Sequence, residues 1–367
     1  MKKVFISIVV LLISITSFGQ TDSPDLSKMK TIRANSAMLD IRDGDVFYKD
    51  AWTIVPTEKP EILTTQSERV TFITDLDSIT FNIEPNETYD LVILHGTNSA
   101  WIQIKSIPSY LETLRQAGGY EKSDTVGLPH FYYETSESSR LKDVRRYFKL
   151  DSIAGTGDEI SKILNIMYWI HDNITHDGSN YALAEFNSID LYHYHKATGK
   201  GINCRHLSIA LNEMYLSMGW KSRYVTCLPE DENDQDCHVI NSVWVDSLQK
   251  WIWIDPTFAA YIKDENGNFL SINEVRERLI DGRPVVLNED ANWNNQNKQT
   301  VEEYLMNYMA KNLYWILVPV NSQFNPESRY RNNVNKFVSL LPIGYKQSDM
   351  EHMGTITHDS EYFWQKP

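Results

Sequence analysis

The chain has 367 residues, of which 42% are hydrophobic and 12% aromatic, so it holds enough apolar bulk for about two globular domains. Its formal net charge of −14 argues against binding nucleic acid through a basic surface. Three cysteines are too few for a disulfide-stapled scaffold or a cysteine-rich zinc module.

Residues 1–19 have the pattern of a bacterial export signal. Two lysines precede an apolar run of about 15 residues, which is shorter than the roughly 20 needed to span a bilayer. Ser17 and Gly19 are the small residues expected before a cleavage site at Gln20. An uncleaved anchor is the alternative. The sequence thus predicts a periplasmic or secreted protein with no membrane span after signal cleavage.

The first part of the mature chain predicts strands. Residues 20–35 are polar and are predicted to form a tail. From residue 36 to about 106 apolar residues alternate with polar ones, as at Ile79, Phe81 and Ile83, and short turn segments separate the runs. This pattern predicts a β-sandwich domain over 36–120, with a short helix at 107–116 near its end.

The hydrophobic period changes to that of helices after a Gly- and Ser-rich connection predicted at 121–150. Apolar residues at helical spacing predict one helix over 160–174, with Asp158 as its N-cap. A second helix is predicted from Cys204 to Met218, capped by Asn203 and ended by Gly219.

A set of strands follows these helices, which predicts an α+β domain. The strands are expected at 221–228, 238–245, 251–254 and 314–320, with helical and irregular segments at 272–315. The acidic connection 229–237 is expected to be a solvated loop rather than a calcium site, since it lacks EF-hand spacing. The domain boundaries are predicted at 151–345, followed by a polar tail at 346–367.

Three residues of this second domain suggest nucleophilic catalysis. Cys204 lies in the first turn of its helix, where free N–H groups and the helix dipole favour a thiolate. His238 begins one strand and Asp255 ends the next, so adjacent antiparallel strands can bring them together. The aspartate would orient the imidazole, and the imidazole would pair with the thiolate.

Taken singly, each residue has a plain structural alternative: a small buried thiol, a core histidine, or an aspartate that starts a turn. Their order and their positions on the predicted elements favour catalysis. The backbone N–H of Cys204 can serve an oxyanion hole. The second donor is not identified by the sequence, and Tyr192, Tyr194 and Trp169 are guesses.

The segment 158–262 resembles the transglutaminase-like superfamily, a papain-related fold of cysteine enzymes. The resemblance rests on the helix that ends in Asn173-Ile-Thr-His-Asp177 and on Gly201-Ile-Asn-Cys204 at the start of the next helix. It continues through three further motifs, which are Met218-Gly-Trp-Lys-Ser-Arg223-Tyr-Val, Cys237-His238-Val-Ile-Asn-Ser-Val-Trp244 and Trp251-Ile-Trp-Ile-Asp255-Pro-Thr257. One departure is that Val239 and Ile240 follow the histidine where the family usually has an aromatic residue.

The resemblance implies a papain-like transglutaminase core of helices packed on an antiparallel sheet. Together with the β-sandwich-like domain that the strand pattern predicts before it, this gives an α+β fold. The resemblance places the nucleophile on Cys204, the base on His238 and the orienting acid on Asp255. The resemblance implies acyl transfer from an amide through a thioester. With the export signal, the predicted function is an exported cysteine hydrolase or acyltransferase that acts on peptide or protein amides. Hydrolysis is favoured over crosslinking because nothing in the sequence identifies an amine-binding site. The alternative is a non-enzymatic scaffold that binds peptides or glycans.

Other residues have weaker claims to chemistry. The sequence predicts neither a metal site nor a bound cofactor, because its histidines lack zinc spacing and are expected to line the approach to the cleft. These are His171, His176, His193, His195 and His206. Trp244, Trp251 and Trp253 are expected in the core rather than in a sugar platform.

The two remaining cysteines predict a disulfide. Cys227 and Cys237 flank the acidic loop at the ends of two strands, and an exported protein meets an oxidising compartment. A Cys227–Cys237 bridge would leave Cys204 free. The alternative is two reduced, buried thiols.

Overall fold

The computed structural model describes residues 29–56, 59–122, 127–328, 336–346 and 354–367. The chain divides into two compact units, with the boundary between Ile107 and Pro108. The predicted export signal at 1–19 lies outside the described residues. Among the helices described, none has the length and the apolar composition required to cross a membrane.

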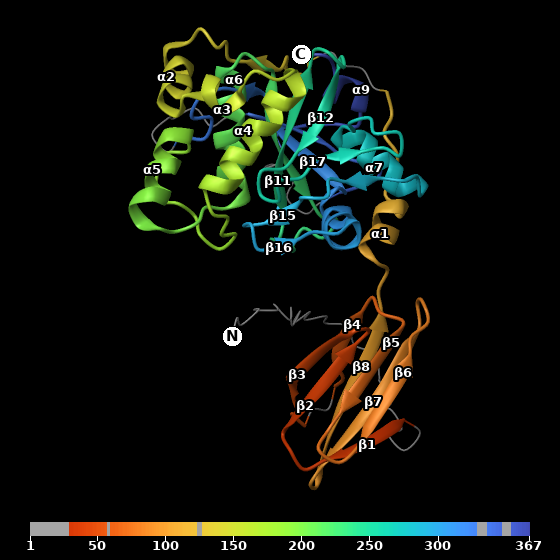
Figure 1. The fold of residues 1–367 in the computed structure, drawn as a ribbon. Helices are drawn as coiled ribbons and strands as arrows, with labels where there is room; N and C mark the ends of the chain where they lie inside the picture. The colour runs from red at the N-terminus through yellow and green to blue at the C-terminus, as the bar shows by residue number, and fades with distance from the viewer. Residues whose placement is uncertain (1–28, 57–58, 123–126, 329–335, 347–353) are drawn as a thin grey trace. The chain divides into compact units, whose positions relative to one another are not determined.

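The first unit is a β-sandwich, as the alternating pattern predicts (Figure 1). One sheet has the order β1-β7-β8-β4 and the other β3-β2-β5-β6. Side chains that alternate along the strands, such as Val70 and Phe72 on β5 and Ile102 and Ile104 on β8, are buried between the sheets. The strands are β1 (Lys30–Ala34), β2 (Met38–Asp43), β3 (Val46–Thr53), β4 (Glu61–Thr65), β5 (Arg69–Ile73), β6 (Ser78–Asn82), β7 (Thr88–His95) and β8 (Asn98–Ser106).

The second unit is built on a six-stranded sheet with the order β12-β11-β10-β17-β19-β20. Its neighbouring strands are antiparallel except for the parallel pair β19 and β20. Its strands are β10 (Ser222–Leu228), β11 (His238–Val245), β12 (Lys250–Ile254), β17 (Trp315–Pro319), β19 (Phe337–Leu340) and β20 (Thr355–Thr357). The expected strands at 221–228, 238–245, 251–254 and 314–320 are therefore present in this sheet.

Apolar layers cover both faces of this sheet (Figure 1). Alternate residues of β11 divide between them, with Val239 in the cluster of the first helical layer and Ile240 in the cluster of the second. The first layer contains α2 (Ser139–Phe148), α3 (Leu150–Ala154), α4 (Glu159–Asn173), α5 (Ser188–Thr198) and α6 (Cys204–Ser217). The second contains α1 (Tyr110–Gln116), α7 (Ile272–Asp281), the π-helix η2 (Glu302–Met309) and α8 (Ala310–Asn312).

The two helices that matter for the site form where the sequence predicts them. Asp158 caps α4 by accepting from the Ser161 N–H, and Asn203 caps α6 by accepting from the His206 N–H. Gly219 ends α6 with φ +96°, a backbone conformation that a residue with a side chain rarely adopts. From His206 to Ser217 every residue of α6 is buried, so the start of this helix is held firmly against the sheet.

Three predicted segment assignments differ from the structure. Residues 30–34 of the expected polar tail form β1, which pairs with β7. The expected connection 121–150 contains β9 (Tyr132–Tyr133) and α2. The expected tail 346–367 contains β20 and α9 (Ser360–Phe363). β1, β9, β20 and α9 are two to five residues long, too short to show a clear hydrophobic period. The helix α2 is amphipathic, with Leu141, Val144 and Phe148 buried, and the sequence analysis missed it.

The remaining short strands form three ribbons outside the large sheet. They are β13 (Ile262–Lys263) with β14 (Val286–Leu287), β15 (Asn292–Trp293) with β16 (Asn297–Lys298), and β18 (Asn321–Ser322) with β9.

Candidate active site

Cys204 is the first residue of α6, as predicted. Its side chain is half-buried, and the N–H groups of this first turn have no acceptor within the helix. These groups and the helix dipole favour negative charge at the sulfur. From His206 onward α6 is buried, so the position of this thiol is set by the core.

His238 and Asp255 meet as the strand order predicts. β11 and β12 are antiparallel, with Asn241 paired to Ile254, so the start of one strand lies beside the end of the other. His238 Nε2 donates to Asp255 Oδ2 at 2.7 Å, and both side chains are fully enclosed. Since Nε2 is occupied, Nδ1 is the ring nitrogen left for Cys204, with which the His238 side chain also hydrogen-bonds.

Asp255 has two further donors. Tyr304 on η2 donates its hydroxyl to Oδ2 at 2.6 Å, and the Thr257 backbone N–H donates to Oδ1 at 2.8 Å. Trp253 in turn donates its indole N–H to the Tyr304 hydroxyl at 3.2 Å. The sequence analysis missed Tyr304, because nothing in its local pattern indicates that η2 reaches the end of β12.

The surroundings of Cys204, His238 and Asp255 shift the pKa of each side chain. Burial raises the pKa of the Cys204 thiol, but hydrogen bonds from His176 and His238 outweigh burial and lower it from 9.0 to about 6. Burial lowers the pKa of His238, but the charge and hydrogen bond of Asp255 raise it from 6.5 to about 10. Burial raises the pKa of Asp255, and the interactions with His238 and Tyr304 lower it overall. Near neutral pH the site therefore holds a thiolate beside an imidazolium.

A second histidine, His176, also hydrogen-bonds with Cys204. The segment around it forms a parallel bridge with Ile202, two residues before the cysteine. The indole N–H of Trp293 donates to His176 Nδ1 at 2.9 Å. The sequence analysis expected His176 only to line the approach to the cleft, whereas its side chain contacts Cys204 itself. The Thr-His-Asp motif that follows α4 was the only sequence feature that pointed to this residue.

The other predicted histidines lie in different places. His171 contacts the Pro256 carbonyl and the Asn292 side chain, next to the loop that carries Asp255. His206 is buried between the rings of Tyr181 and Phe186. His193 contacts the Tyr147 hydroxyl and His195 the Lys200 carbonyl, both on the exposed side of α5. Among the described residues no group of three metal-ligating side chains gathers.

Among the guessed oxyanion donors, Tyr194 donates its hydroxyl to Asn180 Oδ1 at 3.4 Å. The rings of Trp169 and Tyr192 contact each other, with centroids 5.7 Å apart and planes tilted by 35°. The acidic loop is paired, since Lys311 donates to Asp234 and Asp236. The three tryptophans of the strand motifs are buried in the core, as expected: they are Trp244, Trp251 and Trp253.

The predicted Cys227–Cys237 disulfide is wrong for this structure, in which all three cysteines are free. The register of β10 and β11 places Cys227 opposite His238, so Cys237 lies one residue beyond the partner position. Because successive side chains of a strand point to opposite faces, the two thiols are not facing each other. Burial raises the pKa of both, which leaves Cys204 as the acidic thiol.

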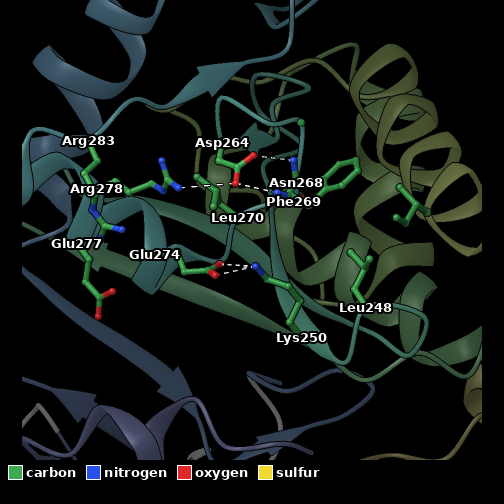
Figure 2. A pocket seen from close by; sticks show the side chains of 12 residues that line it. Leu248, Lys250, Asp264, Asn268, Phe269, Leu270, Glu274, Glu277, Arg278 and Arg283 are labelled. Carbon is green, nitrogen blue, oxygen red and sulfur yellow. Dashed lines mark hydrogen bonds and ion pairs between the residues drawn. The ribbon is translucent and has the colours of Figure 1, made fainter.

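A separate surface recess has a volume of about 760 Å³. Figure 2 shows its lining, in which Lys250 pairs with Glu274 at 2.7 Å and Arg278 with Asp264 at 3.7 Å. None of the residues of the Cys204 site lines it. The recess therefore adds nothing to the chemistry described above.

Several solved structures are similar to this chain at low sequence identity. The chain is similar to a solved "putative cysteine protease" from Cytophaga hutchinsonii, with 15% identity and a TM-score of 0.25 over 50% of this chain and 65% of that one. It is similar to a "putative protease" from Parabacteroides distasonis, with 12% identity and a TM-score of 0.24 over 59% and 37%. It is similar to red sea bream transglutaminase, with 12% identity and a TM-score of 0.22 over 66% and 51%. In each case less than two thirds of the solved protein is covered.

No curated protein gives a match. Residues 147–256 match the family model of the transglutaminase-like superfamily, and this stretch holds Cys204, His238 and Asp255. Over these residues the chain therefore matches the core of the transglutaminase-like superfamily.

Proposed function

We propose that this protein is a cysteine acyl-transfer enzyme that cleaves amides through a thioester on Cys204. The observation that carries the proposal is the meeting of three groups: a helix-start thiol whose pKa is lowered to about 6, His238, and the buried Asp255 at 2.7 Å from that histidine. A lowered thiol pKa beside a carboxylate-oriented imidazole is what an activated cysteine nucleophile requires.

The acylation step uses the pair as it stands. Cys204 Sγ attacks the carbonyl carbon, a C–S bond forms, and the electron pair of the C=O bond moves to the oxygen. When this adduct collapses the C–N bond breaks, and the leaving amine takes the proton from His238 Nδ1. The products are a thioester on Cys204 and a neutral His238. Asp255 holds the imidazole in place throughout.

Deacylation regenerates the pair. Water loses a proton to His238 Nδ1 while its oxygen attacks the thioester carbon, and collapse breaks the C–S bond. The acid is released, and the thiolate and imidazolium are restored. We propose water as the acceptor because it needs no binding site of its own, with transfer to an amine as the competing outcome. We further propose a peptide or protein substrate met outside the cytoplasm, based on the export pattern at 1–19.

The proposal is tested with an activated ester, which requires no knowledge of the natural substrate. The purified protein is mixed with p-nitrophenyl acetate at about pH 7, and acetyl groups are located by peptide mass spectrometry. We expect acetylation of Cys204 well above the rate of free glutathione, and none at this position in Cys204→Ala. The control variant should fold normally, since replacing a thiol by hydrogen costs at most about 2 kcal/mol. If Cys204 is acetylated no faster than glutathione, the proposed enzyme activity is contradicted and the alternative of a binding scaffold remains.

A further inference from the structure

His176 differs from His238 in what its ring nitrogens contact. An indole N–H can only donate, so the bond from Trp293 at 2.9 Å requires Nδ1 of His176 to be an acceptor. The proton of the neutral ring must then be on Nε2. A second proton on Nδ1 would break the bond to Trp293. Trp293 thereby leaves Nε2 as the donor nitrogen of His176, whereas the Nε2 of His238 is paired with a carboxylate.

The backbone delivers this ring to the nucleophile. The Asp177 N–H donates to the Ile202 carbonyl, and the Ile202 N–H donates to the Thr175 carbonyl, both at 2.9 Å. The segments are close because residue 201 is a glycine: a Cβ there would lie 2.8 Å from the Thr175 carbonyl oxygen. The position of His176 is therefore coupled to the start of α6 through two residues of backbone.

A hairpin distant in sequence supports the ring from the other side. Asn294 and Asn295, between β15 and β16, both have φ near +54°, which makes a tight type I′ turn. The Asn294 side chain accepts from the His176 N–H at 2.8 Å and donates to the His176 carbonyl at 3.0 Å. This pair of bonds fixes the backbone of His176, while the neighbouring Trp293 fixes its ring.

We infer that the Nε2–H of His176, together with the backbone N–H of Cys204, forms the oxyanion hole of the acyl-transfer reaction, and that Trp293 is its positioning residue. This inference rests on the proposed function. In the resting site Nε2–H donates to the Cys204 sulfur. Once the C–S bond forms, the sulfur loses its charge and the former carbonyl oxygen gains it. The donor is then beside the new anion, with no proton transfer needed.

The chemistry of the two histidines is thus divided. His238 gives and takes the proton that the leaving amine and the water exchange. His176 acts as a hydrogen-bond donor through Nε2, because Trp293 already donates to its Nδ1. Preorganised donors of this kind act where charge develops, and removing one typically lowers the rate about 10²- to 10³-fold.

The test compares two reactions of the same thiol in the full-length protein. Acetylation by p-nitrophenyl acetate passes through an oxyanion, and alkylation by iodoacetamide does not. Both rate constants for Cys204 are measured at about pH 8, where the thiolate is formed, and their ratio is the readout. In His176→Phe we expect this ratio to fall about 100-fold, with alkylation changed less than about threefold. In Trp293→Phe, which keeps the ring and removes the N–H, we expect a fall of about tenfold.

Two variants serve as controls. His176→Gln should restore most of the ratio, since its amide can accept from Trp293 through Oε1 and donate through Nε2. His193→Phe replaces an exposed histidine of α5 and should leave the ratio unchanged. An unchanged ratio in His176→Phe and Trp293→Phe, with wild-type Cys204 rapidly acetylated, overturns this inference alone. Wild-type Cys204 that is not acetylated overturns the proposed function itself.

Discussion

Cys204 should be alkylated by iodoacetamide at a pH where ordinary thiols are unreactive. With its pKa lowered from 9.0 to about 6, half of this thiol is ionised at pH 6. A free cysteine with a pKa of about 8.5 is then about 0.3% ionised, so the thiolate of Cys204 is favoured about 160-fold. A thiolate of lower pKa is also less nucleophilic, by roughly 13-fold over about 2.5 pKa units at a Brønsted slope of 0.4–0.5. The net expectation is a rate about 12 times that of free cysteine.

The pH dependence of the two reactions should reveal the lowered pKa of Cys204 and the raised pKa of His238. The alkylation rate should rise through about pH 6, as the thiol loses its proton, and should then level off. Acyl transfer should also decline above about pH 10, where His238 loses the proton that the leaving group needs. Since burial raises the pKa of Cys227 and Cys237, peptide mass spectrometry at pH 6 should find the label on Cys204.

The matched variant is His238→Ala, which removes the imidazolium and leaves α6 untouched. Its alkylation rate at pH 6 should fall at least about tenfold, because the thiol loses a hydrogen bond and a neighbouring positive charge. The reasoning is refuted by a wild-type midpoint near pH 9, or by a His238→Ala profile that superimposes on that of the wild type.

Three further substitutions test the supports of the site. Tyr304→Phe removes the hydroxyl that donates to Asp255 Oδ2 and should lower the free energy of unfolding, measured in urea, by about 1.5–3 kcal/mol. This loss should shrink in acid, as the carboxylate is protonated. A loss below about 0.5 kcal/mol would contradict the reasoning. Gly201→Ala places a Cβ against the Thr175 carbonyl and should lower the free energy of unfolding by about 1–3 kcal/mol. It should also slow the acetylation of Cys204. Unaltered stability and rate would show that the close approach is unimportant. Asp255→Asn removes the charge that raises the pKa of His238. The protein should still fold, and the pH midpoint of Cys204 alkylation should move to a higher value. An unshifted midpoint would remove Asp255 from the mechanism.

Much of the core could be predicted because its signals are local. The helix from Cys204 shows an apolar face, an Asn cap and a terminal glycine within one short stretch, and the structure begins and ends it at those residues. The strand from His238 has the predicted bounds, and its pairing with the next strand follows from the short turn between them. The meeting of Cys204, His238 and Asp255 follows from these elements.

The supports of the site could not be predicted, because they depend on contacts between distant segments. Trp293 and Asn294 are more than 100 residues from His176, and an Asn-Asn pair is a weaker turn signal than Asn-Gly. Tyr304 reaches Asp255 only through the packing of η2 on the sheet. The disulfide prediction failed for a related reason. The spacing of the two cysteines in the sequence does not determine the register of β10 against β11, and a shift of one residue places a side chain on the opposite face of the sheet.

The central claim is that Cys204 forms a thioester with an amide carbonyl. The direct measurement is an acid quench of the protein after mixing with a complex pool of peptides, followed by intact-mass and peptide-level mass spectrometry. The account predicts acyl adducts on Cys204 that hydroxylamine removes, that accumulate in wild type and that are missing in Cys204→Ala. If no such adduct forms, while Cys204 of the same preparation is alkylated at pH 6 as described, the thiol is activated but does not react with amides, and the claim is contradicted.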